Sequence, residues 1–356
     1  MKKVLAHIVV FEDFPHLQYC LHSLRAGRGD FELALEVTEN GPSKSGNVDL
    51  QALCDQFGAT LYRNDGNLGF SGAHNQAATR FLASDYDYFL IVNPDLALRE
   101  NALSVLLQTI EPAASAIICP LLIRADDKLV PVQPQIIDSA GMEFVSSLRH
   151  FDRYAGRQLK DVSLSVGPVP GGSGACLLFS RKSVHMLVLP RDSSPLALFD
   201  VFPQLAEGYR EREQLFDESF FAYREDAELS LRARKFGVLI CFQPEAVGFH
   251  VRRVTPERRS ALSEDINRHS VRNRFLLQLL HWSPKEQPET ILPGFILRNL
   301  VVILGVLFFE RTSMRGLVEA VKLTPFAWRG RKRMQRIAKS YSSNMNAEDP
   351  IEQASL

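Results

Sequence analysis

The sequence predicts an α/β fold, namely a doubly wound, mostly parallel sheet with an antiparallel extension and a C-terminal helical appendage. Three observations predict this architecture. Strand-like and helix-like segments alternate in the first half of the chain, apolar strands end in polar tips, and the sequence after residue 250 is helical and more basic. Such alternation is typical of a parallel sheet covered by helices on both faces. A chain of 356 residues has room for one large domain and an appendage.

The composition is that of an ordinary globular protein, with 46% hydrophobic and 23% charged residues. The 41 basic residues balance the 41 acidic ones, so the net charge does not indicate a partner. Five cysteines are scattered without a C-x-x-C pair, which favours free thiols in a reducing compartment over disulfides or a zinc site. The start of the chain, MKKVLAHIVVFEDF, lacks the long apolar core of a signal peptide. We therefore expect a cytoplasmic protein.

The secondary structure is expected in the following order. Strands are predicted at residues 4–11, 33–38, 60–63 and in YDYFLIVNPD, and helices at residues 15–24, 49–57 and 72–83. From about residue 117 the chain is rich in strands and turns, which favours an antiparallel extension of the sheet. Residues 192–212 have weak periodicity and predict a surface loop. An acidic loop then enters a helix that stops at Gly237, and the strand VLICFQPEAVGFH follows.

Three polar stretches are expected at one edge of the sheet. In open α/β sheets, ligands bind beyond the carboxyl ends of the strands. Glu39, residues 64–72 and residues 93–95 each follow a predicted strand, so they are predicted to lie together.

The glycine-rich stretch NDGNLGFSGAHNQAATRF spaces Gly66, Gly69 and Gly72 three residues apart. It contains neither G-x-G-x-x-G nor G-K-[ST], which excludes the common dinucleotide and nucleoside triphosphate loops. Two interpretations remain open. The stretch is either a tight turn that begins a helix, or a site for a diphosphate or nucleobase built from amide side chains and free helix N–H groups.

The tip of the fourth strand, residues 93–95, carries one carboxylate, Asp95. It is either a helix-capping turn or an oxygen ligand for Mg²⁺ or Mn²⁺ bridging a diphosphate. His250 ends a later strand just before two arginines. A lone histidine is more often structural, and His250 becomes a candidate ligand only if its strand ends at the same edge as Asp95.

The stretch FDESFFAYREDAE holds five acidic residues among aromatic ones. An exposed helix start favours acidic residues through the helix dipole. Alternatively, one carboxylate is a general base whose pKa is raised by a partly apolar wall.

These motifs together resemble the family 2 glycosyltransferases, most nearly the rhamnosyltransferase-like branch. The resemblance spans residues 4–274 and continues more weakly to residue 333. The motifs are, in chain order, HIVVFED, VTENGP, RNDGNLGFSGAHNQA, YFLIVNPDLAL, IIDSAG, VPGGSGACLLFSR, FDESFFAYREDAELSLRARKFG and RHSVRNRF. The resemblance implies a GT-A fold with one nucleotide-sugar-binding domain, and inversion at the anomeric carbon.

The resemblance also implies roles for individual residues. The donor-binding positions are Phe11, Glu39, Asn67, Gly69, Asn75, Asn93 and Asp95. Asp226, with Glu225, matches the catalytic base. Asp95 and His250 match the shell of a Mg²⁺ or Mn²⁺ ion. The positions expected at the acceptor or donor sugar are Gly172, Ser173 and Arg272. Residues 192–212 are longer than the family pattern and are expected to contribute to an acceptor-specific lid.

The resemblance suggests rhamnose from a dTDP donor first, with a UDP-sugar-dependent galactosyl or galactofuranosyl transferase as the alternative. Two departures keep a non-catalytic nucleotide-sugar-binding relic open. Glu39 stands where the family usually has Asp, and Asn93 stands where the metal motif D-x-D has its first carboxylate. A nucleotidyltransferase ranks behind these, because VFEDFPHL lacks the glycine-rich signature expected after the first strand.

We expect a catalytic domain at residues 1–252, a helical region at 253–343 and a flexible tail at 344–356. The apolar segment Ile291–Phe309 contains Arg298 and Asn299, which favours a helix packed on the domain or lying in a membrane interface over a true span. The basic stretch FAWRGRKRMQRIAK is either a solvated helix or an attachment to an anionic membrane surface. No nucleic-acid motif accompanies it, so nucleic acid is not expected as a partner. A membrane-surface enzyme fits a glycan or polyprenyl-linked acceptor.

Overall fold

The computed structural model describes residues 1–42, 49–113, 115–252, 264–283, 288 and 291–348. The strands are β1 (Lys2–Val10), β2 (Phe31–Asn40), β3 (Ala59–Asn64), β4 (Tyr88–Val92), β5 (Leu96–Leu98), β6 (Ala116–Arg124), β7 (Ile137–Ser139), β8 (Met142–Phe144), β9 (His150–Asp152), β10 (Gly167–Pro168), β11 (Cys176–Ser180) and β12 (Leu239–His250). The helices are α1 (Leu17–Arg25), α2 (Leu50–Gln56), α3 (Gly69–Ala83), α4 (Ala102–Ile110), α5 (Arg181–Leu187), α6 (Leu196–Phe199), α7 (Glu225–Lys235), α8 (Glu264–His281), α9 (Arg298–Phe309) and α10 (Met314–Glu348).

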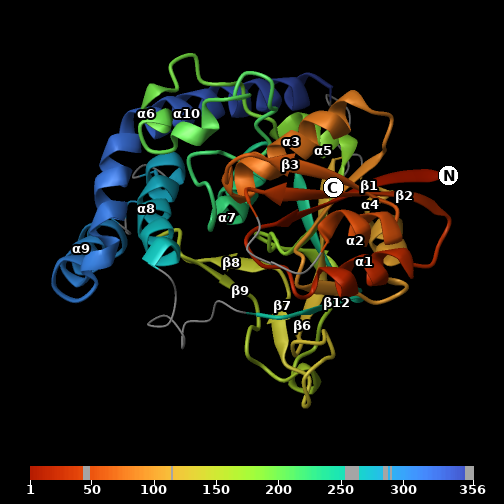
Figure 1. The fold of residues 1–356 in the computed structure, drawn as a ribbon. Helices are drawn as coiled ribbons and strands as arrows, with labels where there is room; N and C mark the ends of the chain where they lie inside the picture. The colour runs from red at the N-terminus through yellow and green to blue at the C-terminus, as the bar shows by residue number, and fades with distance from the viewer. Residues whose placement is uncertain (43–48, 114, 253–263, 284–287, 289–290, 349–356) are drawn as a thin grey trace, which may run out of the picture.

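One ten-stranded sheet forms the centre of the molecule (Figure 1). Its main path runs β10-β12-β6-β11-β4-β1-β2-β3, with β5 paired to β12 and β7 to β6. The first four strands are parallel, as predicted from their alternation with helices. The predicted antiparallel extension is more limited than expected, because β6 and β12 run parallel to each other. The antiparallel members are β5, β7, β10 and β11.

Helices cover both faces of this sheet. Successive residues of β1 alternate between the two faces, so Val4 and Ala6 enter one core while Leu5 enters the other. The first core is shared with α1, α2 and α4, and the second with α3, α5 and α7. All five cysteines are buried and free, as predicted. The double covering buries the central strands β4, β6 and β11 almost completely and leaves the carboxyl ends of the strands as the edge where a polar site can form.

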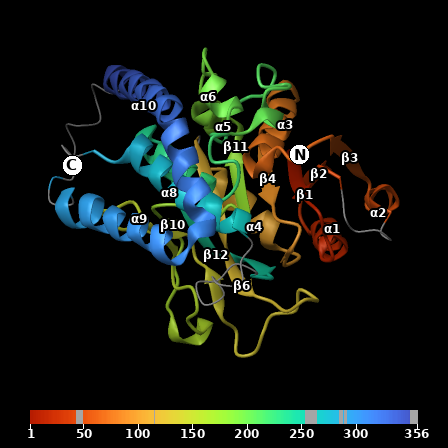
Figure 2. The same cartoon turned by 60° about the vertical axis from the view of Figure 1, so that its left-hand side comes forward.

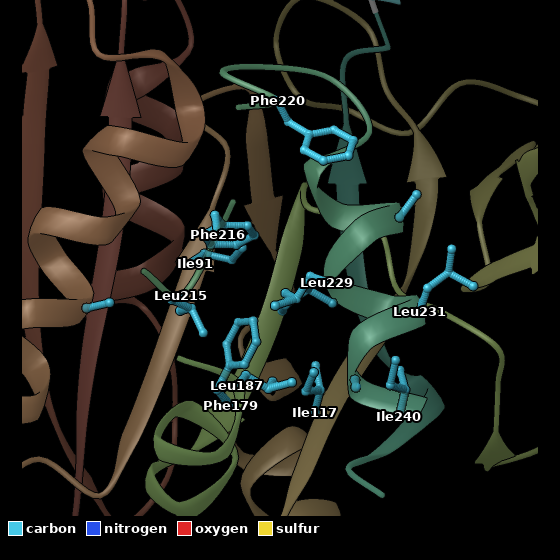
Figure 3. Packing of buried hydrophobic residues seen from close by; sticks show 14 of the residues in the cluster. Ile91, Ile117, Phe179, Leu187, Leu215, Phe216, Phe220, Leu229, Leu231 and Ile240 are labelled. Atoms are coloured by element: carbon cyan, nitrogen blue, oxygen red, sulfur yellow. The ribbon is translucent and has the colours of Figure 1, made fainter. Parts of the chain in front are cut away.

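The acidic segment that precedes α7 lies over the second core. Figure 3 shows Leu215 and Phe216 in the same cluster as Ile91 of β4, with Leu229 of α7 nearby. Phe216 and Phe220 are both fully buried. Apolar side chains therefore anchor this acidic segment, so that its carboxylates are carried on a packed scaffold rather than on a free loop.

The prediction that residues 192–212 form a surface loop is wrong in part. Leu198, Phe202, Leu205 and Tyr209 are buried in the second core. Asp192 is buried as well, and its carboxylate accepts hydrogen bonds from two arginines of α10. Residues 192–212, called the insert below, are therefore packed between the domain and the C-terminal helices. Its apolar residues recur at a helical spacing that its prolines and charges obscured.

The C-terminal helices differ in their burial. Helices α8 and α10 contact each other and contribute Leu276, Leu323 and Phe326 to the second core. Figure 2 shows α9 projecting beside them. Only 12% of the apolar window in the segment Ile291–Phe309 is buried. Of the two expected arrangements, packing of the whole segment on the domain is therefore not observed, and a place in a membrane interface stays a prediction. Among the described residues, Ile291–Phe309 is the one helical segment long and apolar enough to cross a membrane.

The expected domain boundaries meet the structure as follows. The boundary between residues 252 and 253 adjoins residues 253–263, which lie outside the described residues. Helix α10 continues to Glu348, past the expected start of the tail at residue 344. The rest of that tail, residues 349–356, also lies outside the described part of the chain.

Candidate active site

The structure brings Asp95 and His250 together. This meets the condition set above for His250 to be a candidate ligand, namely that its strand ends at the same edge as Asp95. Strand β5 pairs antiparallel with the end of β12, so that Leu96 lies opposite His250. The Nε2 atom of His250 lies 3.4 Å from Oδ1 of Asp95. Both side chains remain partly exposed, and both therefore face the same edge of the sheet.

A second carboxylate fixes the orientation of His250. Asp138, which is almost fully buried, lies 2.8 Å from Nδ1 of His250. Arg252 donates to Asp138 and also pairs with Asp152 at 2.7 Å. Burial alone would lower the pKa of His250, but hydrogen bonds to Asp138 and Asp95 outweigh it and raise the pKa to about 9. The imidazole thus lies between two carboxylates, which favour its protonated form.

The donor set around His250 fits a divalent cation. An imidazole nitrogen and a carboxylate oxygen lie close enough to bind one ion, and a histidine ligand normally has a carboxylate on its other ring nitrogen. Within the described residues, no cluster of three or more protein ligands is found. A bound ion would therefore take further ligands from a substrate diphosphate and water, as Mg²⁺ commonly does.

Residues 216–228, the stretch FDESFFAYREDAE, carry five carboxylates, and three of them have structural roles. Asp217 caps a turn by accepting from the Ser219 N–H. Two others form buried ion pairs, Glu218 with Arg212 and Glu228 with Arg232. These pairs tie the segment to the insert and stabilise α7.

The two remaining carboxylates begin α7 at the edge of the sheet. The Oδ2 atom of Asp226 accepts from the Gly174 N–H at 3.0 Å, and its Oδ1 accepts from the Ala227 N–H at 2.8 Å. Asp226 therefore lies against the turn that contains Gly172 and Ser173. The structure thus brings these two segments, far apart in the sequence, into contact.

Loss of hydration raises the pKa of both carboxylates. Burial raises the pKa of Asp226 to about 6, and the nearby charge of Asp152 acts in the same direction. Burial and the charge of Asp226 raise the pKa of Glu225 well above its usual value. The Oε2 atom of Glu225 is buried and has no hydrogen-bond partner within the part of the chain that the structure describes. Perturbed acids of this kind are typical of catalytic sites.

The glycine loop is organised by Asn40, a residue that the sequence analysis did not single out. Its side chain accepts from the Leu68 N–H and donates to both Asn67 and the Gly69 carbonyl. Asn67 in turn accepts from the Gly69 N–H at 2.8 Å. Asn40 belongs to the motif VTENGP, and its place at the end of β2 was the signal that could have identified it.

Glycine is required at position 69. Its φ is +71°, and an added Cβ would lie 2.3 Å from the carbonyl oxygen of Phe221. The Ser71 N–H donates to the same carbonyl at 3.0 Å. The glycine loop and the segment leading to Asp226 are therefore in direct contact.

Phe11 and Glu39 lie at the ends of β1 and β2. Phe11 is 45% exposed, which is unusual for a large apolar side chain and leaves its ring available for stacking. Glu39 is mostly buried and pairs with Arg63 at 3.0 Å. Asn93 lies at the end of β4, and its N–H donates to the Ala175 carbonyl beside Gly174.

Two expected site residues do not face the site edge in this structure. Asn75 is fully buried, and its amide bonds the backbone of Phe216 on both sides. Arg272 is also fully buried, and its guanidinium contacts Glu319 and the Phe220 carbonyl. Both side chains bond the backbone of residues 216–220 instead of a ligand, and they thereby hold the acidic segment in place.

Comparison with known proteins identifies the family. The model of glycosyl transferase family 2 matches residues 6–187, about half of the chain. The chain belongs to glycosyl transferase family 2. No curated protein sequence matches it. The matched residues 6–187 include the glycine loop and Asp95 but not Asp226.

Solved structures confirm the GT-A fold of this family 2 chain. GalNAc-T7 with UDP, GalNAc and Mn²⁺ is similar with a TM-score of 0.56 at 14% identity, over 88% of this chain and 54% of that one. The chain thus spans about half the length of GalNAc-T7. TarS 1-349 of S. aureus in complex with UDP-GlcNAc is similar with a TM-score of 0.50 at 13% identity, over 99% of this chain and 95% of that one.

The contact between the glycine loop and Phe221 predicts a large difference between two glycines. Gly69→Ala should lower the free energy of unfolding by about 2–4 kcal/mol, because it adds both backbone strain and an overlap with the Phe221 carbonyl. The Cβ added by Gly66→Ala, in the same loop, would lie 3.9 Å from Gln204 and have no closer neighbour among the described residues. This variant should therefore change the free energy of unfolding by less than about 0.5 kcal/mol. Chemical denaturation of both variants measures this, and equal effects would contradict the proposed contact.

Proposed function

We propose that this protein is an inverting glycosyltransferase that moves a sugar from a nucleoside diphosphate donor to a hydroxyl of a glycan or lipid-linked acceptor. The observation that carries the proposal is Asp226, a carboxylate of raised pKa held by the N–H groups of Gly174 and Ala227. Gly174 also lies near Phe70 of α3, and its neighbour Ala175 is bonded by Asn93, at the strand end that carries Asp95. A base, a diphosphate site and a cation site at one edge are what such a transfer requires.

The reaction follows from this arrangement. Asp226 accepts the proton of the acceptor hydroxyl as that oxygen attacks the anomeric carbon. The new glycosidic C–O bond forms while the C–O bond to the diphosphate breaks on the opposite face, and the nucleoside diphosphate leaves. Asp226 is oriented by the N–H groups of Gly174 and Ala227, so its free lone pairs are left for the incoming hydroxyl.

Asp95 and His250 would hold a Mg²⁺ or Mn²⁺ ion beside the diphosphate. When bound, the ion offsets the negative charge that develops on the leaving group. Asp138 holds His250 in the orientation that directs Nε2 toward Asp95.

The donor is proposed to be a nucleotide sugar. Two similarly folded proteins are described with UDP or UDP-GlcNAc, which supports this class. Rhamnose from dTDP-rhamnose is the first choice, and a UDP-galactosyl or UDP-galactofuranosyl donor is the alternative. Phe11 would stack on the base, with Glu39 and the loop of Asn67 and Gly69 around the nucleoside diphosphate. A thermal-shift panel of dTDP, UDP and their sugars, with and without Mn²⁺, tests both nucleotide and metal. No shift with any of them would contradict the proposal.

The role of Asp226 predicts a defined kinetic change. Asp226→Asn should reduce kcat by about 10²- to 10⁴-fold while donor affinity is retained, because only the base is lost. In the parent enzyme kcat/KM should fall as the pH drops below about 6, since burial raises the pKa of Asp226 to that value and the protonated carboxyl cannot act as a base. Steady-state rates across pH measure both. Asp161→Asn, on the surface, is the control, and transfer by Asp226→Asn at the parent rate would refute the assignment.

The cation site predicts metal-dependent donor binding. Asp95→Ala should reduce nucleotide affinity in Mn²⁺ to the value that the parent protein shows in EDTA, because one of its two protein ligands is removed. Titration calorimetry with the nucleoside diphosphate measures this. Asp127→Ala, which removes an exposed carboxylate, should bind like the parent, and an Asp95→Ala protein that still responds to Mn²⁺ would exclude Asp95 as a ligand.

An anionic membrane surface is the proposed location, on the cytoplasmic side. Helix α9 exposes large apolar side chains, including Phe308 at 68% and Phe309 at 91%. The apolar stripe continues along α10 through Met314, Val318, Val321 and Trp328, each exposed. Around this face lie the exposed basic residues Arg298, Arg311, Arg315, Lys322, Lys332 and Arg336. Apolar side chains bordered by positive charge suit a helix that lies in an anionic interface.

Part of the basic stretch has other contacts. Arg329 and Arg333 bind Asp192, and Arg331 donates to the carbonyls of Leu279 and Trp282. The attractive charge therefore comes from the exposed residues around α9 and α10 and less from this stretch than its composition predicts. Each basic residue near an anionic surface contributes roughly 1 kcal/mol.

Vesicle binding tests this location. The protein should cosediment at low salt with vesicles containing phosphatidylglycerol and less with neutral phosphatidylcholine vesicles, because both apolar burial and charge contribute. Phe308→Ser with Phe309→Ser should weaken binding, whereas Leu196→Ser, which alters an equally exposed apolar residue on α6, should not. Absence of binding to the anionic vesicles would refute the proposal.

A further inference from the structure

The turn that leads into Glu225 and Asp226 has an unfavourable backbone. Phe221, Tyr223 and Arg224 have φ values of 63°, 69° and 70°, although none of them is glycine. Non-glycine residues, and bulky ones above all, rarely adopt this left-handed conformation. Such a conformation persists only where surrounding contacts hold it, and it is concentrated at functional sites.

Two neighbouring residues of α8 supply those contacts. The Nδ2 atom of Asn273 lies 2.8 Å from the Phe220 carbonyl oxygen, 2.8 Å from that of Ala222 and 2.6 Å from that of Tyr223. Arg272 donates to the Phe220 carbonyl from the same side at 2.6 Å. Three carbonyls of one turn therefore converge on a single amide group.

Asn273 and Arg272 are themselves held firmly. Both are fully buried, and Nε of Arg272 donates to Oδ1 of Asn273 at 2.9 Å. Arg272 also pairs with Glu319 of α10 at 3.2 Å. The amide of Asn273 is thereby fixed with its Nδ2 group toward the turn and its oxygen toward Arg272.

The opposite side of the turn contacts the glycine loop and the start of α3. The Phe221 carbonyl accepts from the Ser71 N–H, and Gly69 lies against it. The ring of Phe221 stacks on Phe202 of the insert at 4.6 Å between centroids. The turn is thus held between the glycine loop on one side and α8 on the other.

We propose that Asn273, supported by Arg272, is a positioning residue for the catalytic carboxylates. It fixes the left-handed turn at residues 221–224 so that Glu225 and Asp226 begin α7 facing the sugar site. It does not touch the substrate and acts through the three carbonyls. The effect of Asn273 on catalysis rests on the proposed transferase function, whereas its effect on the backbone of residues 221–224 does not.

The test replaces Asn273 by Asp in the full-length protein. Asn273→Asp keeps the size of the side chain and the oxygen that accepts from Arg272, and it removes the N–H donors to the turn. Gln278→Glu is the matched control. Gln278 is also a buried amide of α8, its oxygen accepts from Asn299, and its N–H group donates to Ser147, away from the turn. Asn273→Ala is made in parallel, so that an effect of the new carboxylate is recognised.

Hydrogen exchange measures the turn without any substrate. Amides of residues 220–226 should exchange at least about tenfold faster in Asn273→Asp and Asn273→Ala than in the parent, while those of β1 and β4 stay protected. Gln278→Glu should leave the exchange of the turn unchanged. If the turn is equally protected in both Asn273 variants, or if Gln278→Glu loosens it as much, Asn273 has no special positioning role.

Kinetics measure the consequence for catalysis. In both Asn273 variants kcat should fall about 100-fold with the donor KM within about twofold, since a small displacement of a catalytic group has an effect of this size. In Asn273→Ala, which adds no charge, the acid limb of the pH profile should also move to lower pH, because water admitted to Glu225 and Asp226 lowers their pKa. Unchanged kcat and an unmoved limb overturn the proposal. If the parent protein turns over no nucleotide sugar, the proposed function fails, whereas the exchange rates still decide whether Asn273 holds the turn.

Discussion

The candidate site depends on the buried polar anchoring of residues 216–226. This segment carries the two carboxylates of raised pKa, yet it has no regular secondary structure before α7. Asn75 bonds the backbone of Phe216, Glu218 is paired with Arg212, and the α8 side chains bond the turn that follows. A buried amide or ion pair is favourable only when its partners are present. The segment therefore has one conformation in which all of these groups are satisfied.

That anchoring explains how a mostly parallel sheet supports chemistry at its edge. The sheet places the ends of β1, β2 and β4 side by side, and β5, which follows Asp95, pairs with the end of β12 and so brings Asp95 to His250. The acidic segment then adds Asp226 from the other side of the edge, against Gly174. In the proposed function, the sheet supplies the proposed cation ligands, and a strained segment held by buried hydrogen bonds and ion pairs supplies the proposed base. Precision in such a site comes from the supporting contacts as much as from the residues that react.

Much of the fold was predictable because its signals are local. The apolar runs of β1 and β4 are buried on both faces, and Asp95 and His250 end their strands where parallel topology places ligands. The roles of Asn75 and Arg272 were not predictable, because an amide or a guanidinium next to a motif looks the same in sequence whether it faces a ligand or a distant segment. The projection of α9 also depends on tertiary contacts that its composition does not encode.

The contact between Gly69 and Phe221 has a consequence for the order in which the protein becomes functional. It joins a loop early in the chain to a turn that is made much later, and such long-range contacts form slowly because they require closure of a large loop of chain. The glycine loop and the turn at residues 221–224 therefore come into lasting contact only after α7 and α8 have been synthesised and docked. A nascent or truncated chain that ends before residue 216 retains the residues that match the family model but lacks Asp226, the proposed base.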